Sequence, residues 1–181
     1  MKIAVFCSSS EQIANHFKQM AYELGKWIAE TGHTLIYGGA TGGLMSAVAE
    51  GAYTSKGNII GVVPQSVIDK GRKTKLPIDL YTTADLNERK KIMRQHADIF
   101  VVLPGGIGTM DEMFDIMSSG TLAEHNKPLV ILNWEHYYDH LINLFEWMKQ
   151  EKCLSKVEIY KPYIAQTIDE CKNIINKYII E

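Results

Sequence analysis

The sequence predicts an α/β protein with a doubly wound, mainly parallel sheet of about seven strands flanked by helices. Short apolar runs rich in β-branched residues recur without polar alternation, a pattern typical of parallel strands covered on both faces. Helical stretches separate these runs, and such alternation is expected of right-handed βαβ units. With 181 residues and 46% hydrophobic side chains, the chain fits one domain spanning residues 1–181.

The expected elements follow in order along the chain. Each apolar run is too short for a helix, which favours strands at 3–6, 34–37, 58–63, 98–103, 128–132 and near 157–160. The expected helices are roughly 11–31, 42–55, 85–97, 109–124, 137–151 and one from about 167. One stretch, 64–77, is irregular and carries four Lys or Arg residues. We interpret it as an ordinary surface loop in preference to a lid over a substrate.

Composition and charge exclude several classes of function. The net charge of −2, from 19 basic and 21 acidic residues, gives no basic field for nucleic acid, so we expect no nucleic-acid partner. Cys7, Cys153 and Cys171 are widely spaced and form no CxxC, which favours a cytoplasmic protein without a disulfide framework or a zinc site. No apolar run is long enough to be a signal peptide or to span a membrane, so we expect no membrane partner.

Three loops are expected at the carboxyl ends of the strands, where ligands bind in open α/β sheets. They are residues 7–10, which include Ser8, residues 38–43, which include Gly42 and Gly43, and residues 104–109. The last loop contributes Gly105, Gly106, Ile107, Gly108 and Thr109. Taken singly, each glycine loop is explained by a tight turn. Two of them before helices at one sheet edge favour phosphate binding, because helix N-termini present free N–H groups.

The nucleotide motifs that are missing narrow the choice. Leu44 stands where a Walker loop needs lysine, which disfavours γ-phosphate transfer. Neither loop matches GxGxxG, and the strand 34–37 ends in Tyr37 and Gly38 where a dinucleotide site needs an acid for the ribose hydroxyls. A mononucleotide is the ligand that remains.

Glu112 has two interpretations. Thr109 and Glu112 form a T-x-x-E pattern before a helix, so the glutamate could complete a capping box and take no part in chemistry. Alternatively, Glu112 lies one turn into the helix and faces the sugar of a nucleotide whose phosphate is bound by the loop. A carboxylate there could stabilise positive charge at C1′ or deprotonate the attacking water.

Arg89 is unexpected on its helix face. At about 100° per residue, it projects between Ile92 and Met93, in the apolar arc of the helix that spans 85–97. Its stem could run to the edge of the arc and leave the charge in water. Otherwise the guanidinium needs an anionic partner, since burying it unpaired is costly. That partner is either a substrate phosphate or Glu112.

The motifs GGATGGLM, NERKKIM and PGGIGTMDE, in this order, resemble those of the LONELY GUY (LOG) family of cytokinin riboside 5′-monophosphate phosphoribohydrolases. The resemblance runs from the first strand to about Leu154. It implies a Rossmann-like fold, a homodimer, and cleavage of a nucleoside 5′-monophosphate to free base and ribose 5-phosphate. It also implies that Arg89 and Glu112 are catalytic, that Lys90 of the Arg-Lys pair contacts substrate, and that the glycine loop at 105–109 cradles the phosphate. No cofactor or metal is implied.

Some features depart from the family or leave alternatives open. Ser46 replaces a common glycine, and residues 118–121 replace a tryptophan-containing stretch, so the preferred base, adenine or prenylated adenine, stays open. Relatives often carry the label lysine decarboxylase, which we reject because no pyridoxal phosphate site is recognisable. The main alternative is a non-catalytic nucleotide or molybdenum-cofactor binding protein of the same fold. His136 and His140 are interpreted as surface or packing residues, and the aromatic residues at 134–147 as packing or a subunit contact.

Overall fold

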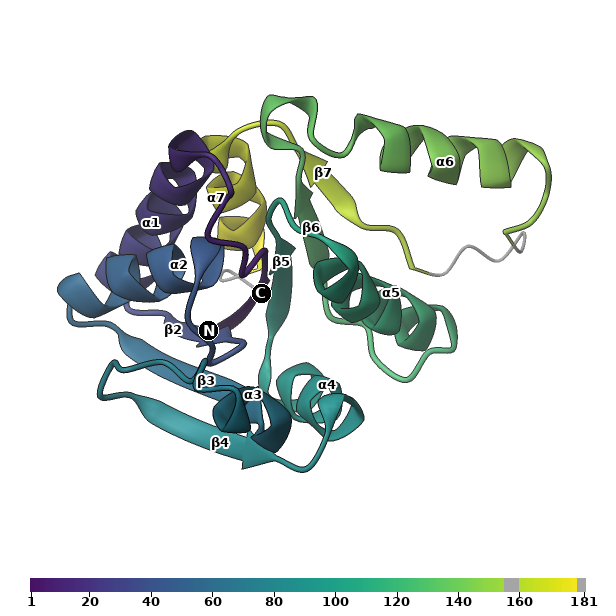
Figure 1. The fold of residues 1–181 in the computed structure, drawn as a ribbon. Coiled ribbons are helices and arrows are strands. Elements are labelled where there is room, and N and C mark those ends of the chain that lie inside the picture. The colour runs from purple at the N-terminus through teal and green to yellow at the C-terminus, as the bar shows by residue number, and fades with distance from the viewer. Residues whose placement is uncertain (155–159, 179–181) are drawn as a thin grey trace.

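A computed structural model describes residues 1–154 and 160–178 of the chain. Its centre is one seven-stranded sheet in the order β4-β3-β2-β1-β5-β6-β7, in which every neighbouring pair is parallel (Figure 1). The predicted doubly wound α/β fold is confirmed. The strands are β1 Lys2–Phe6, β2 Thr34–Tyr37, β3 Asn58–Pro64, β4 Asp79–Thr83, β5 Ile99–Val102, β6 Leu129–Leu132 and β7 Tyr163–Ala165.

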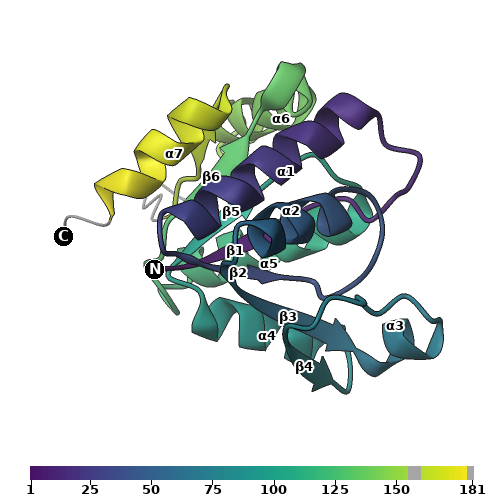
Figure 2. The same ribbon diagram turned by 90° about the vertical axis from the view of Figure 1, so that its left-hand side faces the viewer.

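Helices cover both faces of the sheet (Figures 1 and 2). The helices α1, α2 and α7 pack on one face, and α4, α5 and α6 pack on the other. Their bounds are α1 Asn15–Glu30, α2 Gly43–Thr54, α3 Gln65–Asp69, α4 Leu86–His96, α5 Ile107–Thr121, α6 Asp139–Gln150 and α7 Ile168–Lys177, with a short 3₁₀ turn η1 at Trp134–His136. None of the described helices combines the length and apolar character needed to cross a bilayer.

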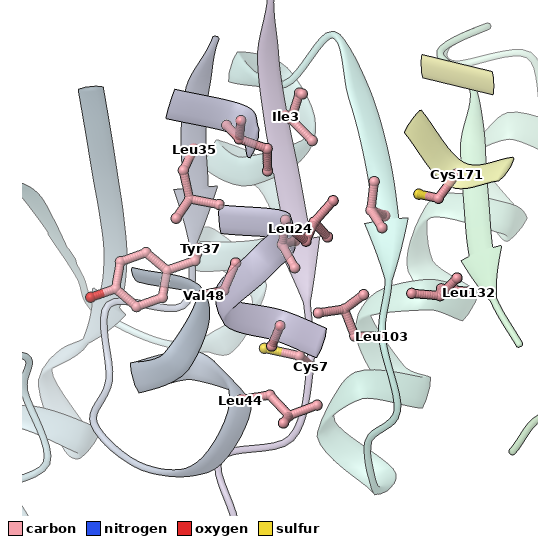
Figure 3. Packing of buried hydrophobic residues seen from close by; sticks show 14 of the residues in the cluster. Ile3, Cys7, Leu24, Leu35, Tyr37, Leu44, Val48, Leu103, Leu132 and Cys171 are labelled. Atoms are coloured by element: carbon pink, nitrogen blue, oxygen red, sulfur yellow. The ribbon is translucent and has the colours of Figure 1, made fainter. Parts of the chain in front are cut away.

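The core explains why the central strands read as uninterrupted apolar runs. Ile3 and Val5 of β1 face the α1 and α2 layer, while Ala4 and Phe6 face the α4 and α5 layer, and all four are buried. Figure 3 shows part of the first of these clusters. Because both faces of each central strand are covered, no polar position alternates with the apolar ones.

The strands β4 and β7 and the helix α3 were not predicted. β4 (DLYTT) is an edge strand with three exposed positions, so it has no apolar run that would reveal it. The stretch 64–77, expected to be irregular, contains the helix α3. The strand expected near 157–160 lies, except for Tyr160, outside the described residues. The last strand is instead the three-residue β7, and Tyr160 is not part of it.

Candidate active site

The sheet order places the two halves of the fold on either side of a switch point between β1 and β5. The chain winds outward from β1 to β4 and then returns to β5 beside β1, which is the type of switch point where doubly wound folds bind ligands. The loops that follow these two strands meet there, since the amide of Ser8 donates to the carbonyl of Pro104 at 3.1 Å. The loops expected to lie together therefore do so.

The pair Arg89 and Glu112 lies near this switch point, since both charges act on Cys7, which directly follows β1. Arg89 is 7% exposed and Glu112 is 3% exposed. Their charged atoms, Nη1 and Oε1, are 2.5 Å apart, and Arg89 Nε donates to the carbonyl of Val62 at 2.9 Å. Of the partners considered for Arg89, the structure shows Glu112.

Local sequence explains how Arg89 reaches this position. Asp85 caps α4 by accepting from the amide of Glu88 at 2.8 Å, and the Glu88 carboxylate accepts from the amide of Ala84 at 2.7 Å. These two bonds fix the helix start, and with it the face on which Arg89 points to the core. Gly38, at the end of β2, leaves room for the guanidinium, because a Cβ there would overlap Arg89 Nη2.

The capping-box interpretation of Glu112 is wrong. The N-cap of α5 is Gly106, and the helix begins at Ile107, two residues earlier than expected. Thr109 is therefore inside the first turn, where its buried hydroxyl packs against Gly105 so tightly that a Cβ on Gly105 would overlap it. Glu112 turns inward to Arg89 and does not reach back to a backbone amide.

The electrostatics of the pair combine two opposing effects. Burial raises the pKa of the Glu112 carboxyl above its ordinary value, and the Arg89 guanidinium opposes that rise. Burial and the nearby charge of Glu112 also raise the pKa of the Cys7 thiol, so this residue stays protonated. Figure 3 shows Cys7 within the apolar cluster near Leu44 and Leu103, where it packs as a small buried hydrophobe.

The first turn of α5 leaves its amides open. Gly106, Ile107 and Gly108 are exposed, and the Ile107 side chain is 86% exposed. Within the described residues, no acceptor binds their N–H groups. Free amides at a helix N-terminus can hold an anion. Glu112 lies six residues after the N-cap, which is about 9 Å along the helix axis at 1.5 Å per residue.

Comparisons with known proteins identify the family. A family model described as "Possible lysine decarboxylase" matches residues 45–177. A cytokinin riboside 5′-monophosphate phosphoribohydrolase of Rhodococcoides fascians is 36% identical over 174 residues, covering 95% of this chain and 84% of that protein. One from Arabidopsis thaliana is 32% identical, covering 98% and 84%. This chain belongs to the LONELY GUY family. For a rice relative named a probable enzyme of this kind, 36% identical, the match covers 80% of this chain but only 63% of that protein.

Solved structures share the fold of this LONELY GUY family member. A molybdenum cofactor binding protein of Rippkaea orientalis superimposes with a TM-score of 0.73 at 23% identity, covering 98% of this chain and 96% of that one. A molybdenum cofactor carrier protein of Chlamydomonas reinhardtii gives 0.72 at 21% identity, covering 99% and 97%. At this level of identity the likeness shows the fold alone.

In this LONELY GUY protein the start of α2 differs from that of α5. Gly42 and Gly43 are buried behind residues 8–10, and the amides of Leu44 and Met45 donate to the carbonyl of Ser8 at 2.9 and 3.3 Å. The amide of Gly42 donates to the Ser46 hydroxyl at 2.8 Å. The first glycine loop thus closes a tight turn against the Ser8 segment, and the protein itself occupies these amides.

The contacts of Lys90 bear on the lysine decarboxylase label, which the sequence analysis rejects. Lys90 Nζ lies 2.8 Å from Asp111 Oδ1 and 3.8 Å from Asp115 Oδ1, between α4 and α5. An ion-paired lysine is a poor candidate for the free amine that a pyridoxal phosphate aldehyde would need.

In the described residues, no group of three or more His, Cys, Asp or Glu could hold a metal, and His136 instead pairs with Asp139 at 3.2 Å.

Two features near the site were missed from sequence. The first is Arg72, which bonds to two loops of the site. Its backbone carbonyl accepts from the amide of Thr41 at 2.7 Å, and its side-chain Nη2 donates to the carbonyls of Ser9 and Thr41 at 3.2 and 3.3 Å. The stretch expected to be a solvated loop therefore lies across two of the site's loops. The second feature is a pair of tyrosines behind the α5 loop. Tyr138 packs in the core as expected. The hydroxyls of Tyr137 and Tyr138 also donate to the carbonyls of Gly105 and Leu103, respectively.

Proposed function

We propose that this protein hydrolyses the N-glycosidic bond of a purine nucleoside 5′-monophosphate and releases free base and ribose 5-phosphate. The observation that carries the proposal is a buried carboxylate, Glu112, on the same helix as three open amides and about 9 Å further along its axis. Amides at the helix start suit the phosphate, and the carboxylate suits the sugar carbon. The cytokinin riboside 5′-monophosphate phosphoribohydrolases to which the chain is related support this reaction.

In the proposed mechanism the bond between C1′ and the base nitrogen breaks and a bond from C1′ to a water oxygen forms. Glu112 accepts a proton from the attacking water and stabilises the positive charge that develops on the sugar. The departing base takes up a proton from bulk water, to which Glu112 afterwards returns its own. A carboxyl pKa raised by burial makes Glu112 a stronger base than a surface glutamate.

The remaining site residues support these two groups. Arg89 places and neutralises Glu112 from behind. We assign the phosphate to the amides of Gly106, Ile107 and Gly108, with Gly105 and Thr109 shaping the turn. Ser8 lies on the β1 side of the switch point with Gly42 and Gly43 buried behind it, and Lys90 lies beside α5 through Asp111. The proposal needs no cofactor and treats residues 1–181 as one nucleotide-binding domain.

Incubation of the pure protein with AMP, followed by detection of adenine and ribose 5-phosphate, tests the proposal. A panel of monophosphates that includes pyrimidine and prenylated adenine bases identifies the preferred base. Turnover of at least one purine monophosphate is the expected result. Binding of monophosphates without turnover would favour the non-catalytic alternative, a nucleotide or molybdenum-cofactor binding protein.

A homodimer is part of the proposal, and α6 is the element that supports it. None of its residues is buried, although Leu144 and Trp147 are large apolar side chains and Trp147 is 60% exposed. With α5 and β7 it borders a mainly apolar groove of about 490 Å³ that includes Phe114, Met117 and Phe145. Figure 1 shows α6 extending beyond the body of the sheet. Light scattering should give the mass of a dimer, and Trp147→Glu should give a monomer. A monomeric wild type would contradict this.

The cytoplasm is the proposed location. Cys7, Cys153 and Cys171 are free thiols in the structure, as a reducing compartment would keep them. Cys153 is the exposed cysteine. A membrane-impermeant thiol reagent should not label it in intact cells but should label it after lysis. Labelling before lysis would contradict this location.

A further inference from the structure

The loop that precedes α5 is held from behind by two consecutive tyrosines. The Tyr137 hydroxyl donates to the carbonyl of Gly105 at 3.0 Å, and the Tyr138 hydroxyl donates to the carbonyl of Leu103 at 2.7 Å. These bonds join positions 32 and 35 residues apart in the chain. Neither tyrosine belongs to the groups that the mechanism uses.

The bond to Gly105 fixes the direction of an amide. The carbonyl of Gly105 and the N–H of Gly106 belong to one peptide unit, which is planar and trans. In a trans unit the C=O and the N–H point in opposite directions. When Tyr137 holds the oxygen on its own side, the Gly106 N–H must point to the other side. That N–H is one of the exposed amides without an acceptor among the described residues.

The tyrosines are themselves held by a buried asparagine. Asn133 is buried, its Oδ1 accepts from the amide of Tyr138 at 2.7 Å, and its Nδ2 donates to Asp139 Oδ1 at 2.8 Å and Gln166 Oε1 at 3.1 Å. These bonds fix the backbone on the carboxyl side of η1. The Tyr137 hydroxyl is therefore presented from a well-anchored segment.

The backbone between Asn133 and Tyr137 adopts an unfavourable conformation. Glu135 and His136 have φ values of 50° and 62°, the left-handed region that residues with side chains rarely adopt. Strained backbone persists only where the surroundings enforce it, and it often occurs at functional sites. On the other side, the Tyr137 ring packs edge-on against Phe17 at a centroid distance of 5.9 Å. The segment thus keeps a costly conformation that brings Tyr137 behind the glycine loop.

We propose that Tyr137 is a positioning residue for phosphate binding: its hydroxyl orients the peptide between Gly105 and Gly106 so that the Gly106 N–H faces the ligand. This inference rests on the proposed function, because it assumes that the phosphate binds at α5. Tyr137 touches neither the sugar nor the base in this arrangement. Its effect should therefore fall on the binding of phosphorylated ligands and leave the chemical step alone.

The test compares Tyr137→Phe with Tyr53→Phe. Both tyrosines are 43% exposed, and the Tyr53 hydroxyl has no partner among the described residues, so the control removes an equivalent but unbonded hydroxyl. Calorimetry measures the Kd of ribose 5-phosphate and of adenine, kinetics with AMP give kcat and KM, and hydrogen exchange follows the amides of residues 105–108. For Tyr137→Phe we expect ribose 5-phosphate to bind about two- to tenfold more weakly, the equivalent of one hydrogen bond.

The other readouts separate positioning from a general structural effect. In Tyr137→Phe, kcat and the Kd of adenine should stay at wild-type values. With ribose 5-phosphate bound, exchange at 105–108 should be faster than in Tyr53→Phe, because the misdirected amide is less protected by the phosphate. Unchanged exchange would overturn the inference, as would a ribose 5-phosphate affinity equal to that of the control or an equal loss of adenine affinity. If wild type neither binds ribose 5-phosphate nor cleaves any monophosphate, the proposed function fails and this inference fails with it. If only the Tyr137→Phe effects are missing, the proposed function stands.

Discussion

Replacing Glu112 by glutamine is the most informative single change. The substitution keeps the size and shape of the side chain and removes its charge. Arg89 then stays buried without an anionic partner, since Nη1 faces Oε1 and Nε is already bonded to the carbonyl of Val62. Both the stability and the proposed chemistry should respond.

The stability cost can be estimated from the geometry. Breaking a buried ion pair costs about 3–5 kcal/mol, because one charge is left uncompensated. The amide oxygen of glutamine can still accept from Nη1, and a hydrogen bond to a charged group returns roughly 1–2 kcal/mol of that. The net loss is about 2–3 kcal/mol, which for a chain of this size lowers Tm by roughly 5–10 °C. This differs from a capping box, where glutamine would replace glutamate with little loss.

The catalytic cost comes from losing the base. General acid–base groups contribute typically about 10²–10⁴ in rate, so kcat for AMP should fall by at least about a hundredfold. Release of adenine measured by chromatography gives kcat, and scanning calorimetry gives Tm. Asp111→Asn is the matched control: it removes the adjacent carboxylate, whose partner is Lys90, and should cost about 1 kcal/mol or less.

Two results would refute this reasoning. If Glu112→Gln keeps kcat within a few fold of wild type, Glu112 is not the base. If Tm is unchanged while the Asp111→Asn control behaves as expected, the ion pair with Arg89 contributes less to the free energy of unfolding than its burial implies.

Three further predictions concern the groups around the pair. In Arg89→Met the guanidinium no longer opposes the burial effect, so the raised pKa of the Glu112 carboxyl rises further. A raised carboxyl pKa means that the folded state binds the proton more tightly, so the Tm deficit should be smaller near about pH 5 than near about pH 8, as calorimetry at both will show. In Gly106→Ala the new Cβ would meet no heavy atom within 4 Å and φ is −93°, so Tm should stay within about 1 °C while the methyl group raises the Kd of ribose 5-phosphate. Arg72→Met removes two bonds to loop carbonyls and should lower stability by about 1 kcal/mol in chemical denaturation, whereas Lys75→Met on the same loop should be neutral.

The sequence was sufficient to predict the strands that are buried on both faces, because burial gives them a local apolar pattern. The central strands β1, β2, β3, β5 and β6 are apolar because helices cover both faces, and each was predicted within about one residue of its observed bounds. The edge strands β4 and β7 lie at the two ends of the sheet order. Exposure leaves β4 largely polar, and β7 has only three residues. Hydrophobic periodicity therefore could not find them.

The site shows the same division between local and distant information. Helical geometry alone placed Arg89 in an apolar arc, and the structure shows it buried against Glu112. The T-x-x-E pattern at Thr109 and Glu112 suggested a capping box, but the helix begins earlier, after the N-cap Gly106. A glycine has no side chain to form a cap, so the sequence does not show that it is the N-cap. Arg72 and Tyr137 were missed because their roles depend on contacts with residues 31 to 63 positions away, which no local pattern encodes.

Arg89 also resolves a conflict between the two halves of the site. An isolated carboxylate about 9 Å from a phosphate would raise the free energy of the bound phosphate. The increase is about 2 kcal/mol for each unit of phosphate charge at an effective dielectric constant of 20. That repulsion would offset much of what open amides at a helix start contribute to anion binding. The guanidinium of Arg89 lies against Glu112 on the core side, so the pair is neutral overall and the helix start keeps its positive field. In the proposed site, a carboxylate can therefore stand near the bound phosphate because a buried cation accompanies it.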